Sequence, residues 1–267
     1  MATIGFEELI AASDSAPFQG WDFSHLHGRM TQAPLPFHYL DEVRHLSNLA
    51  SNLAMLDLGT GGGEVLAGFA PFSARTFATE AYLPNALIAA RRLRPLGASV
   101  VLVEGAPENY ASLKTPALDR PALPFRGAAF DLVIDRHESY LPAEVARVLR
   151  SGGRFLTQQC GGSHYCELND LLGIPRPPYE SWRLAEAVTQ LRAVGFDIVQ
   201  EKEAFGLTTF HDVGAIVYYL KAVPWQAPGF EAKNFLEPLR AIHDRIERGV
   251  PLAVRAHHFF VECAKPT

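Results

Sequence analysis

The sequence predicts a doubly wound α/β fold, in which helices cover both faces of a mostly parallel sheet. The first observation behind this prediction is the stretch 54–63, where a short apolar run passes through Asp57 and then breaks into glycines. A helical pattern follows at once, so the stretch is typical of a buried parallel strand, a tight turn and a helix. The second observation is the run 99–103, which is apolar and β-branched, as buried strands are.

The spacing of apolar residues predicts the remaining elements in order. Leu40, Val43, Leu46, Leu49 and Leu53 recur at intervals of three and four, which indicates a helix over 38–52. Further helices are expected at about 63–70, 82–94, 143–149 and 184–194. Strands are expected at 54–58, 75–79, 99–103, 155–160, 197–205 and 252–264. One further strand is expected to end at Asp135.

A chain of 267 residues suits one α/β domain with insertions better than two full domains. We therefore expect a single domain with two inserts that interrupt the sheet pattern. Its predicted parts are an N-terminal arm at 1–37, a core at 38–160 and 183–210, an insert at 161–182, a helical cap at 211–250 and a terminal strand at 251–267.

The composition is that of an ordinary globular protein, with 48% hydrophobic and 20% charged residues. The sequence has no run of eighteen apolar residues and no basic-then-apolar start, so we expect no membrane association and a cytoplasmic protein. Its three cysteines, Cys160, Cys166 and Cys263, lack metal-site spacing and fit reduced thiols. The net charge of −5 makes a nucleic-acid partner unlikely, because the densest basic cluster, residues 91–94, fits a solvated helix end.

The glycine turn excludes two common nucleotide-binding motifs. A dinucleotide fingerprint would need a glycine at position 64, which is Glu64, and a P-loop would need a lysine that the turn lacks. Asp57 and Glu64 bracket the turn with negative charge. The turn is therefore better suited to a neutral or cationic nucleoside that lies against bare backbone than to a phosphate.

The pattern Asp57, Gly59, Gly61, Gly63 resembles motif I of the class I S-adenosylmethionine-dependent methyltransferases. The run 123–135, Leu-Pro-Phe through Phe-Asp-Leu-Val, is similar to the run that leads into strand four in that family. The resemblance covers about residues 50–205 and the terminal strand. It implies a Rossmann-like seven-stranded sheet with strand seven antiparallel, helical inserts after strand five and between strands six and seven, and S-adenosylmethionine as cofactor, with S-adenosylhomocysteine as product.

The resemblance also implies a set of cofactor contacts. Glu80 ends the second strand, 17 residues after Gly63, where an acid can accept both ribose hydroxyls. Gly105 stands where the family often has an acidic side chain near adenine, so the Ala106 N–H is the expected contact. The full set of expected cofactor-binding residues is Arg29, Asp57, Gly59, Thr60, Gly61, Gly63, Glu80, Ala81, Gly105, Ala106, Asp135 and Arg136.

The segment 21–30 combines aromatic residues, histidines and one arginine. One interpretation is a lid over the cofactor, in which Arg29 pairs with the methionine carboxylate. The equal alternative is an arm that packs Trp21 and Phe23 on the domain surface. His25 and His27 lack acidic or cysteine partners nearby in sequence, and we predict no metal site.

Methyl transfer from a sulfonium is a direct displacement, so the protein mainly aligns the reactants and excludes water. His137 is the first candidate for a general base, because it follows strand four beside Glu138, which could orient it or raise its pKa; the alternative is that His137 only packs or hydrogen-bonds. His211, Tyr218 and the pair His257 and His258 are weaker candidates.

Aromatic-rich inserts over the carboxyl edge of the sheet suit a closed pocket for a small, largely apolar methyl acceptor. The alternative is that many of these side chains form the core of the inserts themselves. The expected pocket residues are His25, Tyr140, Gln159, Tyr165, His211, Tyr218 and Trp225. We expect methyl transfer to an O, N or S atom of a small molecule by a monomer or homodimer, with an RNA methyltransferase or a non-catalytic S-adenosyl-ligand binding module as alternatives.

Overall fold

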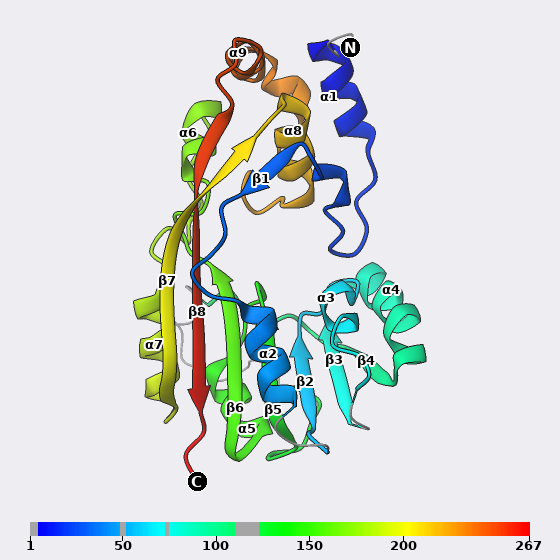
Figure 1. Cartoon of the computed structure of the whole chain (residues 1–267), viewed down its shortest axis with the longest axis vertical. Coiled ribbons are helices and arrows are strands. Elements are labelled where there is room, and N and C mark those ends of the chain that lie inside the picture. The colour runs from blue at the N-terminus through cyan, green and yellow to red at the C-terminus, as the bar shows by residue number, and fades with distance from the viewer. Residues whose placement is uncertain (1–4, 49–51, 73–74, 110–122) are drawn as a thin grey trace.

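The computed structural model of the chain describes residues 5–48, 52–72, 75–109 and 123–267, which build a mixed eight-stranded sheet (Figure 1). The end of the predicted helix 38–52, at residues 49–51, lies outside the described residues. In spatial order β1-β7-β8-β6-β5-β2-β3-β4, the strands are Met30–Gln32, Asp197–Phe210, Leu252–Ala264, Leu149–Cys160, Phe130–Arg136, Met55–Leu58, Thr76–Glu80 and Ala98–Leu102.

The predicted doubly wound sheet is confirmed. Strands β4, β3, β2, β5 and β6 are parallel, and β8 runs antiparallel between β6 and β7. The chain moves outward from β2 through β3 to β4 and then returns to β5 on the other side of β2. Open α/β sheets bind ligands at the carboxyl ends of the strands beside such a switch point.

Alternating side chains of the central strands build two cores, one on each face of the sheet. Met55, Leu132 and Ile134 pack beneath α2 (Tyr39–Ser47), α3 (Glu64–Ala67) and α4 (Leu83–Leu93). Leu56 and Val133 face the other way, toward α5 (Pro142–Val148) and α7 (Leu184–Ala193). Because helices cover both faces of the sheet, side chains on both faces are apolar, and the short strands appear in the sequence as continuous apolar runs.

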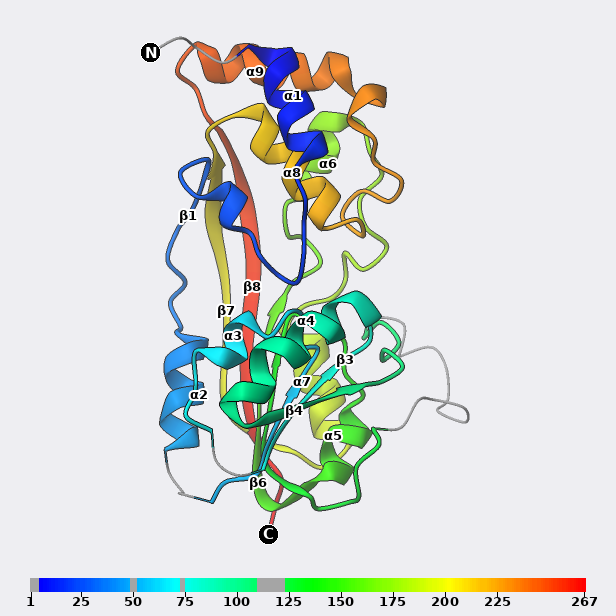
Figure 2. The same ribbon diagram turned by 90° about the vertical axis from the view of Figure 1, so that its right-hand side faces the viewer.

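A third core lies in a cap at one end of the elongated molecule (Figures 1 and 2). The cap consists of α1 (Phe6–Ser15), α6 (Cys166–Leu172), α8 (Val213–Ala222) and α9 (Leu236–Glu247), with the 3-10 turns Ser24–Leu26 and Ala232–Asn234; a further 3-10 turn, Arg94–Leu96, follows α4. Strands β7 and β8 pair from Asp197 opposite Ala264 to Phe210 opposite Leu252, with one register shift between Ile198 and Gln200, and their far halves support the cap. β7 is therefore five residues longer than the predicted strand 197–205.

The N-terminal arm adds a strand that the sequence did not predict. Met30–Gln32 pairs antiparallel with the end of β7, opposite Thr208–Phe210. Earlier in the arm, the Trp21 ring stacks on the Trp225 ring with centroids 6.0 Å apart, so the arm also contacts the segment after α8. Of the helices that the structure describes, none has both the length and the apolar character needed to cross a membrane.

Candidate active site

The glycine turn after β2 has a backbone that side chains would obstruct. Gly59, Gly61 and Gly63 have φ angles of 61°, 61° and 78°, in the left-handed region that favours glycine. A Cβ at Gly59 would overlap the Glu138 side chain, and one at Gly63 would lie 2.9 Å from Leu93. The sequence motif therefore corresponds to a turn that needs glycine both for its conformation and for its space.

Glu80 ties the end of β3 to this turn. Its Oε2 accepts a hydrogen bond from the Gly61 N–H at 2.7 Å, and its Oε1 accepts from the N–H groups of Ala81 and Tyr82 at 3.0 and 2.8 Å. Burial raises the pKa of Glu80, while these three donors stabilise its charged form. Since a carboxylate offers roughly four acceptor positions, Oε2 keeps room for a further donor.

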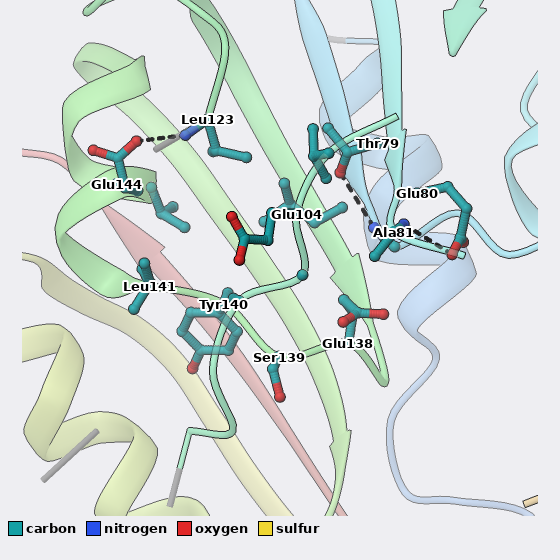
Figure 3. A pocket seen from close by; sticks show the side chains of 16 residues that line it. Thr79, Glu80, Ala81, Glu104, Leu123, Glu138, Ser139, Tyr140, Leu141 and Glu144 are labelled. Carbon is teal, nitrogen blue, oxygen red and sulfur yellow. Dashed lines mark hydrogen bonds between the residues drawn. The ribbon is translucent and has the colours of Figure 1, made fainter. Parts of the chain in front are cut away.

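Three adjoining hollows run along the carboxyl edge of the sheet. The first, which we call the narrow pocket, has a volume of about 40 Å³ and lies between the ends of β3, β4 and β5 (Figure 3). Its lining includes Ala81, Gly105, Ala106, Tyr140, Leu141 and Val145.

The second hollow, the turn cavity, has a volume of about 540 Å³ and lies over the glycine turn. The third, the cap cavity, has a volume of about 340 Å³ and lies between β5, β6 and the segments of the cap. Glu138 lines all three hollows, and His137, Arg136, Trp21 and Trp225 line both of the larger ones. The three hollows therefore adjoin one another at Glu138, and we call them together the cleft.

Acidic groups dominate the centre of this cleft. Burial raises the pKa of Asp57 to about 7; the negative charge of Glu80 also raises it, and a hydrogen bond with the Thr60 side chain lowers it. Burial and the Glu80 charge likewise raise the pKa of Glu138 to about 7. Two carboxyl groups that titrate near neutral pH, beside a third, create an environment that favours a cationic ligand.

His137 lies at the bend after β5 with a φ of 68°, which is uncommon for a residue with a side chain. Its Nδ1 is 3.6 Å from the Cys160 Sγ, and its Nε2 is 3.2 Å from the Gln158 Nε2. Burial and the Arg136 charge lower the pKa of His137 well below its ordinary value. We expected Glu138 to orient the His137 ring or to raise its pKa. In the structure the ring nitrogens face Gln158 and Cys160 instead, and the pKa is lowered.

Asp135 lies beneath the cleft instead of in its lining. Its side chain is fully buried, and its Oδ1 accepts hydrogen bonds from Thr157 at 2.9 Å and from the Gln159 amide at 2.6 Å. Gln159 also donates to the Glu138 carbonyl at 3.0 Å and lines the cap cavity. Asp135, predicted as a cofactor contact, therefore positions Gln159 and the chain that follows β5.

Arg29 has an internal partner. Its guanidinium forms a bidentate ion pair with Asp212, with Nε–Oδ2 and Nη2–Oδ1 distances of 2.8 and 2.6 Å. Asp212 in turn caps α8 by accepting from the Ala215 N–H. Arg29 is absent from the lining of the three hollows, so the expected pairing with a cofactor carboxylate is replaced by a contact that fastens the arm to the cap.

The predicted acceptor residues separate into two groups. Gln159, Tyr165 and Trp225 line the cap cavity, and Tyr140 lines the narrow pocket. His25, Tyr218 and His211 are absent from the lining of all three hollows of the described chain. They lie in the contact between arm and cap, since the His25 ring packs on Tyr218 with centroids 4.4 Å apart and His211 is 3.0 Å from the Thr31 hydroxyl.

Sequence reasoning missed several residues of the cleft. Asn109 fixes the bend after β5, because its side chain donates to the Tyr140 carbonyl at 2.7 Å and accepts from the Tyr140 N–H. Other residues that line the cap cavity and were not expected there include Glu108, Cys160, His164 and Tyr179, whereas His258, a weaker base candidate, does line it. Strand alternation gave no signal for Cys160, because it assigns this residue to the face of β6 opposite to Gln159, which lines the same cavity.

No protein-family model and no curated protein matches the sequence. Solved structures do match the fold. A proposed methyltransferase from Bacillus halodurans C-125 has a TM-score of 0.58 at 17% identity, over 85% of this chain and 99% of its own. The YcgJ protein from Bacillus subtilis has a TM-score of 0.55 at 18% identity, over 86% and 99%. The [4+2]-cyclase SpnF has a TM-score of 0.51 at 16% identity, over 85% and 84%.

These similarities establish that the chain has the fold of the class I methyltransferases. Identities of this size speak to the fold alone. What the chain does with that fold must be argued from its cleft.

Proposed function

We propose that the protein binds S-adenosylmethionine in the cleft and methylates an O, N or S atom of a small, largely apolar molecule held in the cap cavity. The observation that carries this proposal is that the three hollows are neighbours, since Glu138 beside the glycine turn lines all of them. A cofactor along the carboxyl edge and an acceptor under the cap would then adjoin one another.

The narrow pocket suits the adenine ring. Its walls are largely apolar, with Leu58, Val103 and Leu141 among them, and it accepts a flat group between the ends of β3 and β4 (Figure 3). A Cβ at Gly105 would stand 3.4 Å from the Ala81 Cβ, so glycine keeps this side open. The Ala106 N–H remains our proposed contact for the ring.

The turn cavity suits the ribose and the charged methionine portion. Glu80 has an acceptor position left on Oε2 for a ribose hydroxyl. Asp57, Glu80 and Glu138 together favour the positive sulfonium and amino groups by charge. Glycine at 59 and 61 leaves room for the side chains of Glu138 and Trp21, which a Cβ would crowd and which line the turn cavity.

The bound cofactor would supply an electrophilic methyl group on a sulfonium, which needs no further activation by the protein. The chain would contribute alignment and exclusion of water, because Trp21 and Trp225 close the two larger cavities from the arm and the cap. His137 is uncharged at neutral pH and lines the acceptor side, so it adds no positive charge beside the sulfonium.

Transfer of labelled methyl groups tests this proposal. The purified protein, incubated with methyl-labelled S-adenosylmethionine and fractionated small-molecule extracts, should label a low-molecular-weight product and release S-adenosylhomocysteine. Cofactor binding without labelling of any fraction would favour a non-catalytic module. Labelling of RNA alone would overturn the small-molecule acceptor.

A further inference from the structure

Three potential metal ligands meet at the floor of the cap cavity. Cys160 on β6 lies directly opposite His258 on β8 in the strand register. His137 joins them from the bend after β5, and its left-handed backbone sets the position of its ring. One donor atom from each side chain lies within 4.8 Å of the others. The sequence gives no hint of this cluster, because about 120 residues separate His137 from His258.

One donor–donor distance within the cluster matches a tetrahedral zinc site. Zn–S and Zn–N bonds of about 2.3 and 2.05 Å at a tetrahedral angle place sulfur and nitrogen about 3.6 Å apart. The observed distance from the Cys160 Sγ to the His137 Nδ1 is 3.6 Å. Closing the remaining separations of up to 4.8 Å would require side-chain adjustments of about 1 Å.

His258 provides a second, independent indication of a ligand. Its side chain is 5% exposed, and its Nδ1 is buried with no hydrogen-bond partner among the described residues. A buried nitrogen without a partner is costly, and a metal ion would satisfy it. The ring of His164 packs edge-on against His258 at 4.7 Å and restricts its orientation.

We propose that His137, Cys160 and His258 bind one Zn²⁺ ion, with the fourth coordination position open to the cap cavity. Two neutral imidazoles and one thiolate form a soft donor set that suits zinc better than magnesium or calcium. The Gln158 amide lies 3.2 Å from the free Nε2 of His137 and, with its oxygen turned inward, would accept the Nε2 proton. An open position of this kind takes water or an anionic oxygen or sulfur ligand.

The thiolate is the ligand on which binding depends most. The positive charge of Arg136 acts on all three side chains and opposes a further cation. A negative sulfur offsets this repulsion, whereas a neutral ligand would not. In the absence of a metal, the same short distance would be a weak hydrogen bond between His137 and the Cys160 thiol. The two arrangements differ in whether Cys160 carries a thiolate bound to metal.

Zinc titration against a chromogenic chelator distinguishes them. Chelator-treated wild-type protein should bind one Zn²⁺ per chain, and C160S and H258Q should each weaken binding at least about 100-fold, because even outer-shell changes cost 10–100-fold. Co²⁺ should give a thiolate charge-transfer absorption that C160S abolishes. The control is C166S, because Cys166 is a second free cysteine that does not line the cap cavity and whose Sγ lies 3.4 Å from the Gly162 carbonyl. Equal zinc affinity in wild type and C160S would overturn the proposal, as would a Co²⁺ spectrum without the thiolate band.

A second measurement needs no variant. Cys160 lines the cap cavity and is only partly buried, so a thiol reagent can reach it in the wild-type protein. Zn²⁺ should slow alkylation of Cys160 at least about tenfold, measured by mass spectrometry. An alkylation rate that zinc leaves unchanged would contradict the site even if the substituted proteins failed to fold.

Discussion

At the scale of single residues, Glu80 has the most demanding position in the cleft. It holds the glycine turn through three backbone N–H groups and still offers one acceptor position. A glutamine at this position has an amide NH₂ in place of one carboxylate oxygen, and an NH₂ cannot accept the backbone N–H bonds that this oxygen accepts. Hydrogen bonds to a charged group are worth about 1.5–3 kcal/mol, and 1.4 kcal/mol is tenfold in affinity.

We therefore expect E80Q to weaken S-adenosylhomocysteine binding by about 10–100-fold in calorimetric titration. E201Q, a change at an exposed glutamate on β7, serves as the control and should leave the affinity unchanged. Equal affinity in E80Q and E201Q would mean that Glu80 makes no contact with the ligand.

Glu138 allows a pH test at the same scale. Its pKa is 4.5 when exposed and about 7 in the fold, so between these values the folded chain holds a proton that the unfolded chain has lost. The contribution of Glu138 to the free energy of unfolding therefore falls as pH rises from 4.5 to 7, and stays low above. A glutamine at this position has no such penalty.

The Tm of E138Q minus that of wild type should accordingly be more positive at pH 8 than at pH 4.5. In free energy of unfolding the change between the two pH values should be at most about 3 kcal/mol. Thermal melts of both proteins at the two pH values measure this difference, and the other titrating groups are common to both. A difference that does not change with pH would contradict the buried state of Glu138.

At the scale of elements, the contact of arm and cap replaces the contact expected for Arg29. The Arg29 and Asp212 side chains are 23% and 22% exposed, so this pair is largely desolvated and hydrogen-bonded on both sides. We expect R29A to lower the free energy of unfolding by about 2 kcal/mol, from lost charged hydrogen bonds, in chemical denaturation. The affinity for S-adenosylhomocysteine should change less than about threefold, because Arg29 lines none of the three hollows.

D212N separates stability from ligand contact. It weakens the same ion pair, so both substitutions should act alike on stability and on affinity. If R29A weakened ligand binding tenfold and D212N did not, a direct contact between Arg29 and the ligand would follow.

Elements with local signals could be predicted from the sequence. The central strands and their helices follow from apolar periodicity, and the glycine turn follows from its residue types. β1 could not be predicted, because Met30–Gln32 is short and mostly exposed and exists only by pairing with β7. The far half of β7 was missed for a related reason, since Gly206 interrupts the local strand pattern while pairing with β8 sustains the strand.

Site residues followed the same division. Positions fixed by a local motif, such as Gly59 and Glu80, lie at the turn as expected, whereas partners set by tertiary structure were not foreseen. Arg29 and Asp212 are 183 residues apart, and the pairing of Cys160 with His258 depends on the antiparallel register of β6 and β8. A single sequence carries no direct signal for such contacts.

At the scale of the whole molecule, the long antiparallel pair β7 and β8 places a cap with its own core above the switch point of the sheet (Figure 1). The sheet contributes the narrow pocket and the turn cavity, and the cap closes the third hollow over the same edge. This arrangement gives separate places to a cofactor and an acceptor. It makes the glycine turn the feature on which the proposed function depends.

Calorimetric titration with S-adenosylhomocysteine of wild type, G59A and G173A tests that dependence most directly. Gly59 and Gly173 have similar left-handed φ angles, 61° and 67°, so alanine strains both backbones alike. A Cβ at Gly59 would in addition displace the Glu138 side chain at the centre of the cleft, whereas a Cβ at Gly173 meets nothing within 4 Å. We predict one binding site per chain that G173A retains and G59A loses, with no binding of NAD. Undiminished binding to G59A, or binding of NAD alone, would contradict the account.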